Sequence, residues 1–269
     1  MKNLSLTILL LVVSIALHAQ SDTIVSDKTI TNAQLFGIGY ANILDTYLSQ
    51  EKYGGVSLQF LSHTTREQPD KRITSQTAHT TTLSYVESRS SKGKELYGLY
   101  RVQHGWFYNW LLYDNRLTLQ AGGLIDGAVG FLYNTRNSNN VAQAYARLAL
   151  SPAATATYRF DIRNHPVALR YEIDVPLIGL MFSPNYGQSY YEIFNQGNYD
   201  HNVVLTQPFN APSLRHMLSL DFSVGTTILR VGYLGDFHQA DINNLKQHTY
   251  QHSLLIGIVK RFKKIHTRP

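Results

Sequence analysis

The feature that most constrains this chain is an alternation of apolar and polar residues that recurs in segment after segment. In residues 214–224 the even positions are Leu, His, Leu, Leu, Phe and Val, and the odd positions are Arg, Met, Ser, Asp and Ser. Residues 117–134 and 167–175 follow the same pattern. Successive side chains of a β-strand point to opposite faces, so a period of two predicts strands with one apolar and one polar face.

The length of the apolar runs decides how such strands could meet a membrane. After residue 20 the sequence contains no apolar stretch of about 20 residues, the length that a membrane-spanning helix needs. A spanning helix is therefore excluded for that part of the chain. A membrane-embedded form would have to be a closed β-barrel, in which neighbouring strands satisfy every backbone hydrogen bond.

The first 20 residues have the three parts of a secretory signal peptide. Lys2 supplies the positive charge, residues 4–17 are apolar, and Ala19-Gln20 forms the cleavage region with its small residue. We expect cleavage there and a single domain over residues 21–269; an uncleaved N-terminal helix is the alternative. The chain contains no cysteine, which excludes a disulfide framework, thiol catalysis and Cys-ligated metal sites. Its basic residues are scattered, so no nucleic-acid partner is expected.

Ten strands are predicted, and their links alternate in kind. The links at 66–72, 111–115 and 161–165 and near Gly225 are short, whereas the other set includes the long segment 183–212. Short turns at one end and longer loops at the other are typical of an outer-membrane, up-and-down antiparallel β-barrel. Twelve strands and a soluble β-sandwich are the alternatives. The ten strands run over residues 33–43, 54–65, 73–88, 95–110, 116–134, 141–160, 166–182, 213–224, 227–238 and 248–262.

Aromatic residues support the membrane interpretation. Tyr100, Trp106, Tyr108 and Trp110 share one parity of a single predicted strand, near the end where the short links lie. Amphipathic rings at the level of the lipid headgroups form the girdles of outer-membrane barrels. The alternative is the aromatic core of a soluble sandwich.

The export signal, the alternating strands and a last strand that ends in Phe262 resemble gram-negative outer-membrane β-barrel proteins, over essentially the whole mature chain. Among these, the chain looks like uncharacterised small barrels classed as domains of unknown function. Such barrels often end on an aromatic residue that the folding machinery reads. Because seven residues, Lys263 to Pro269, follow Phe262, the resemblance implies an internal form of this signal. It also implies outer-membrane lipid and the barrel-assembly machinery as partners, and no cofactor.

The polar parity gathers charge, and in a barrel it faces the lumen. A ten-stranded barrel is only slightly wider than the eight-stranded size that side chains fill. Because buried charges must be paired, we expect a hydrogen-bonded plug. A solute path or a binding cavity lined by the same residues is the alternative. The set comprises Arg101, Asp126, Arg147, Arg159, Arg170, Glu172, Asp174, Arg215, Asp221, Arg230 and Asp236.

Signals for catalysis or metal binding are weak. His216 and Ser219 are three residues apart, so a strand places them on opposite faces where they cannot pair. His248 and His252 share a face but lie roughly 13 Å apart along a strand, too far for a shared metal ion. We expect no catalytic, cofactor or metal site.

The segment 183–212 is rich in aromatic residues. Within it, residues 190–194 and 202–207 are predicted to pair as a short surface hairpin. Its aromatic residues form either a docking surface for another outer-membrane protein or a small ligand, or a lid packed on the barrel mouth. The candidate contact residues are Tyr186, Tyr190, Tyr191, Phe194 and Tyr199.

The sequence therefore predicts a non-enzymatic barrel in the outer membrane of a gram-negative bacterium, with a filled polar lumen and a structural, adaptor or surface-binding role. A narrow passive diffusion channel is one alternative. An outer-membrane lipid-modifying enzyme is a second.

Overall fold

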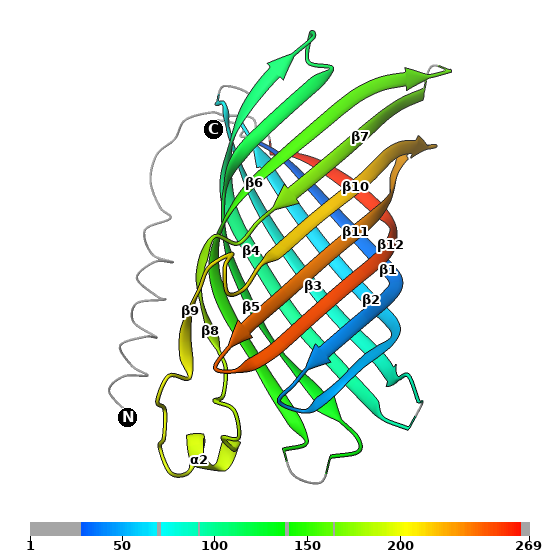
Figure 1. Cartoon of the computed structure of the whole chain (residues 1–269). Helices are drawn as coiled ribbons and strands as arrows, with labels where there is room; N and C mark the ends of the chain where they lie inside the picture. Colours follow the sequence, from blue (N-terminus) through cyan, green and yellow to red (C-terminus); the bar gives the residue numbers. More distant parts are fainter. Residues whose placement is uncertain (1–27, 69–70, 91, 138–139, 164, 265–269) are drawn as a thin grey trace.

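A computed structural model describes residues 28–68, 71–90, 92–137, 140–163 and 165–264 (Figure 1). The expected signal peptide lies outside these residues. The strands are β1 (Lys28–Asp45), β2 (Ser49–Glu67), β3 (Ile73–Ser88), β4 (Lys94–Leu112), β5 (Leu117–Asn134), β6 (Ala142–Ile162), β7 (His165–Asp174), β8 (Ile178–Phe182), β9 (Val203–Thr206), β10 (Ser213–Val224), β11 (Thr227–Ile242) and β12 (Leu245–Lys264), and one short helix is α2 (Tyr190–Phe194).

The strands close into an antiparallel barrel, which confirms the predicted all-β, up-and-down fold. Each of β1 to β6 pairs with the next strand, β7 pairs with β10, and β10 to β12 follow in order. The barrel closes where β1 pairs with β12, from Lys28↔Lys264 to Asp45↔Gln247. We call the end where Lys28 meets Lys264 the terminal end, and the opposite end, which carries α2, the loop end (Figure 1).

The predicted strand 166–182 is broken into β7 and β8, although both segments remain on β6. Leu177 N donates to Leu150 O at 3.0 Å across the break, and Pro176 there has no N–H to donate. Two of the twelve strands, β8 and β9, are therefore short additions to the ten that build the barrel. On its other edge β9 has no strand partner among the described residues. The segment that follows β9 closes the wall against β11, where Gln239 N donates to Pro212 O at 3.0 Å and Asp241 N donates to Asn210 O at 2.8 Å.

The predicted hairpin between residues 190–194 and 202–207 is wrong. Tyr190–Phe194 is the helix α2, and Val203–Thr206 pairs with β8 instead. The reason is a capping box: Glu192 N donates to Ser189 Oγ at 3.3 Å, and Ser189 N donates to a Glu192 carboxylate oxygen at 2.6 Å. This local pairing satisfies backbone groups that a strand would have left to a distant partner.

The links at the loop end are less uniform than predicted. The strands extend further than the alternation indicated, so the links at 46–48 and 243–244 are tight turns. Asn243 and Asn244 have φ values of 55° and 60°, in the left-handed region that asparagine tolerates. Only the other three links at this end are longer.

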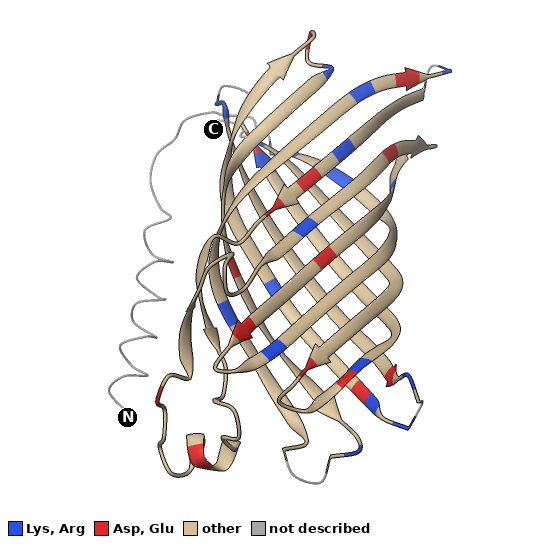
Figure 2. Ribbon diagram, viewed as in Figure 1, with Lys and Arg blue, Asp and Glu red and all other residues tan. Residues whose placement is uncertain are grey.

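The two faces of the wall differ as the alternation predicts. The outward face carries large exposed apolar side chains, among them Phe36, Leu58, Leu148 and Leu254, together with Trp106. Charged residues lie along β4 to β7, β10 and β11 and near the turns at either end (Figure 2). Among the described residues, no helix is both long and apolar enough to cross a membrane.

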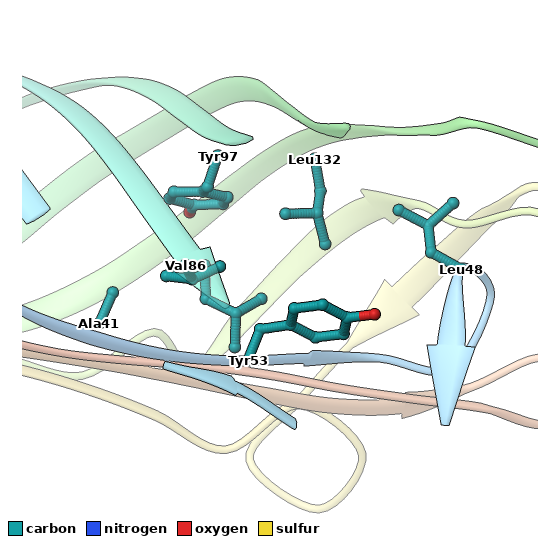
Figure 3. Close-up of a cluster of buried hydrophobic side chains, with 7 residues drawn as sticks. Ala41, Leu48, Tyr53, Val86, Tyr97 and Leu132 are labelled. Carbon is teal, nitrogen blue, oxygen red and sulfur yellow. The ribbon is translucent and has the colours of Figure 1, made fainter. Parts of the chain in front are cut away.

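The loop-end half of the lumen holds a hydrophobic cluster, the loop-end core. Side chains from the first five strands and the β1–β2 turn point toward one another there (Figure 3). This packing fills the part of the lumen bounded by β1 to β5. The buried members are Ala41, Ile43, Leu48, Tyr53, Val86, Tyr97 and Leu132.

Candidate functional site

The middle of the lumen is occupied by Arg101 of β4, whose side chain is 1% exposed. Its Nε donates to both carboxylate oxygens of Asp126 at 2.9 and 3.0 Å, and its Nη1 donates to both oxygens of Asp236 at 3.2 and 3.3 Å. Its Nη2 reaches Asp174 at 3.4 Å. One guanidinium therefore joins acids from β5, β7 and β11, using the five-donor fork that arginine offers.

Two further cations complete this group. Arg147 Nη2 lies 3.5 Å from Asp126, and Arg215 Nε lies 3.8 Å from Asp236. We call Arg101, Arg147, Arg215, Asp126, Asp174 and Asp236 the central cluster. Its three cations and three anions balance, so the cluster carries no net charge.

His238 joins the central cluster as a neutral ring. Arg147 Nη1 lies 2.8 Å from His238 Nδ1, and arginine can only donate, so Nδ1 accepts. The proton of the neutral imidazole is then on Nε2, which lies 2.7 Å from Asp236 Oδ1. His238 thereby links Arg147 to Asp236 without adding charge.

The central cluster crosses the lumen from wall to wall. Gln103 Nε2 of β4 donates to Asp174 of β7 at 3.1 Å, and Arg215 of β10 donates to Thr80 of β3 at 3.2 Å. Arg215 Nη1 also donates to Gln103 Oε1 at 2.6 Å. These contacts join strands on opposite sides of the barrel, so side chains from both sides meet at this level of the lumen.

A second charged group, the terminal-end cluster, lies nearer the terminal end. Arg230 makes two hydrogen bonds to Asp221, at 2.5 and 2.7 Å. Arg170 contacts Glu172, whose carboxylate lies 3.8 Å from His63 Nδ1. Several of these side chains line a polar cavity of about 150 Å³.

Ten of the eleven predicted charged residues thus fall into two separate groups, and Arg159 is in neither. Arg159 does not meet an acid of β7: its Nη1 donates to Thr118 at 2.7 Å, because β6 carries it toward the terminal end. The sequence analysis missed Gln103, His238 and His63. All three lie on the inward parity of their strands, and a search for every polar residue of that parity would have found them.

The predicted surface aromatics behave in two ways. Tyr190 is anchored on the rim, where its hydroxyl donates to Gln143 at 2.8 Å and accepts from Ala144 N at 2.7 Å. Burial raises the pKa of Tyr190. The ring of Tyr47 packs edge-on against that of Tyr190. Burial, and to a smaller extent the negative charge of Asp45, raises the pKa of Tyr47 to about 12. The other four remain 60–69% exposed: Tyr186, Tyr191, Phe194 and Tyr199.

His248 and His252, whose spacing excludes a shared metal ion, each contact a different side chain. His248 Nε2 lies 2.8 Å from Asn42 Oδ1, and His252 Nδ1 lies 2.6 Å from the Tyr233 hydroxyl. Within the described part of the chain, no three His, Asp or Glu side chains are grouped as a metal ion would require.

Comparison with known sequences places the chain in a family. The family described as "Protein of unknown function (DUF3316)" matches residues 4–269. The chain belongs to this family. A search of curated proteins finds no match for this DUF3316 chain.

Solved structures similar to the DUF3316 barrel include the outer membrane protease OmpT from Escherichia coli, at 8% identity and a TM-score of 0.46, covering 90% of this chain and 100% of that one. The translocator domain of the autotransporter NalP from Neisseria meningitidis is 10% identical with a TM-score of 0.42, covering 93% and 92%. An outer membrane channel from Pseudomonas putida F1 is 11% identical with a TM-score of 0.33, covering 90% and 97%.

Proposed function

We propose that this protein is a non-enzymatic barrel of the gram-negative outer membrane whose lumen is closed and whose working surface is its loop end. The observation that carries the proposal is the set of contacts of Arg101, which joins acids of three strands across the bore. The terminal end of the barrel would face the periplasm, and the α2 segment would face the exterior.

The closed lumen follows from the energetics of buried charge. Removing a charge from water costs several kcal/mol unless partners compensate it, and the central cluster supplies a partner for each of its charges. A continuous water column would have to replace these contacts. The balanced cluster therefore favours a plug over an ion path.

Planar-bilayer recording tests the plug. The purified mature barrel is expected to show no steady conductance, whereas Arg101→Ala together with Arg215→Ala, which leaves Asp236 without arginine partners, is expected to open a small cation-preferring leak. The matched control replaces Arg116, an exposed arginine of the β4–β5 turn, with alanine. Steady conductance of the unmutated barrel would instead support the narrow channel.

Location in the membrane is tested by fractionation. The mature chain is expected in the outer-membrane fraction, with heat-modifiable migration on a gel. Recovery as a soluble species after carbonate washing would contradict the proposal.

The working surface rests on the exposed aromatics of the α2 segment. Tyr190 fixes the α2 segment to β6, and the other aromatic side chains of the segment remain exposed to solvent. Such a surface is suited to bind a partner protein in the same membrane or a small ligand. Photo-crosslinking in cells from a probe at the exposed Gln196, just after α2, should yield a defined adduct that Tyr191→Ser with Phe194→Ser abolishes. Tyr113→Ser, which changes a tyrosine at the terminal end that is 75% exposed, is the control and should leave the adduct unchanged.

A further inference from the structure

The loop-end half of the lumen contains a second cavity, which the side-chain contacts described above leave unfilled. It measures about 80 Å³ and lies between the central cluster and the loop-end core. One water needs about 10–15 Å³ of such space, so the cavity has room for roughly five to eight waters or one ring-sized molecule. Its walls are mainly apolar, with Leu99, Ala128, Ile178, Met181 and Ala240 among the lining residues.

One wall of this cavity is shared with the loop-end core. Tyr97, which points into that core, also lines the cavity (Figure 3). Its ring stands edge-on to that of Tyr145, with centroids 5.9 Å apart, and the Tyr145 hydroxyl donates to Asp45 at 2.6 Å. The two rings are therefore fixed and present a preformed aromatic surface.

Arg147 and His238 of the central cluster also line the cavity and supply its polar groups. The Nε of Arg147 is buried and has no hydrogen-bond partner within the described residues. A buried donor without an acceptor costs free energy, so this N–H favours a ligand that brings an acceptor. Because the central cluster is charge-balanced, no net positive charge is left to hold an anion.

The cavity also lies beside the part of the wall where β9 has no strand partner among the described residues. Ile178 of β8 and Thr206 of β9 line it on one side, and Ala240 of β11 lines it on the other. The segment after β9 closes the wall there, because Gln239 N donates to Pro212 O at 3.0 Å and Asp241 N donates to Asn210 O at 2.8 Å. Met181, Val204 and Ala240 pack together behind these bonds.

We propose that this cavity is a binding site for a small, uncharged, mainly apolar molecule that carries one hydrogen-bond acceptor, which accepts from Arg147 Nε. The polar cavity at the terminal end lacks such walls. The site is separate from the exposed aromatics of the α2 segment.

Saturation-transfer NMR on the full mature barrel in detergent tests the proposal with three probes of similar size: benzyl alcohol, toluene and benzoate. Benzyl alcohol is expected to bind saturably, toluene about tenfold more weakly because it lacks the acceptor, and benzoate not at all. Ala128→Leu fills the cavity and should abolish binding. Ala121→Leu, an outward alanine of the same strand, is the matched control.

Arg147→Lys keeps the charge but removes the Nε donor, so it should erase the preference for the alcohol and retain toluene binding. Heat-modifiable migration verifies that each variant is folded. A cavity that holds water only, seen as no saturable binding of any probe, would overturn the proposal. Unchanged binding by folded Ala128→Leu, or benzoate binding as tight as that of benzyl alcohol, would overturn it as well.

Discussion

Arg101 and Asp236 lie 135 residues apart in the chain, yet the guanidinium of the first reaches both carboxylate oxygens of the second at 3.2 and 3.3 Å. The contact joins β4 to β11 across the lumen, so it exists only when the barrel is closed. The contact also depends on the native strand register, because a slip of one residue in either strand would turn that strand's side chain outward.

Arg101→Met should strongly destabilise the barrel. The substitution leaves Asp126, which is fully buried, without its main partner, and breaking a buried ion pair costs about 3–5 kcal/mol of unfolding free energy. Urea titration in liposomes measures this. Arg116→Met, at the exposed β4–β5 turn, should change stability by less than about 0.5 kcal/mol. Equal stability of the two variants would show that the cluster contributes nothing.

Leu254→Arg should test whether the outward apolar face of the barrel lies in the membrane. Leu254 is 68% exposed on the outward face of β12, and arginine at the middle of a bilayer costs about 2–4 kcal/mol. Phe209→Arg changes a side chain that is 97% exposed beside the loop end and should cost much less. The measurement is the same urea titration. The assignment of this face to the membrane fails if both variants behave like the unmutated protein.

Tyr190→Phe should loosen the α2 segment without unfolding the barrel. It removes a hydroxyl that makes two hydrogen bonds with the start of β6, each worth about 1 kcal/mol. Hydrogen exchange at the Ala144 amide should become faster. Tyr191→Phe, whose ring is 61% exposed, serves as the control and should leave that exchange rate unchanged.

The helix α2 should respond to acid. Hydrogen bonds from the Ser189 backbone and hydroxyl lower the pKa of Glu192 below its ordinary value of about 4.3. The capping contribution is therefore fully present above about pH 4.3 and is lost as the pH falls through the folded-state pKa. Amide exchange in α2 should accelerate in that range. Glu192→Ala should exchange fast at all pH values, and an identical acid response in this variant would exclude Glu192 as the cause.

The α2 segment was open to prediction and was missed. Ser189 and Glu192 stand in the S-x-x-E spacing of a capping box, a purely local signal that outweighs the strand propensity of Tyr190 and Tyr191. The break after β7 had a local signal too, because Pro176 cannot donate to a ladder.

Alternation along the chain was sufficient to predict the closed antiparallel barrel and the face of each side chain, because the parity of a strand residue depends only on its own position. Which charges meet depends on strand register and on the width of the barrel, and both arise only when β1 pairs with β12. For this reason the split of ten of the eleven charged residues into two clusters, the role of His238 and the cavity lined by Arg147 emerged only from the folded chain. Long-range pairing decided them, and no segment carries that information alone.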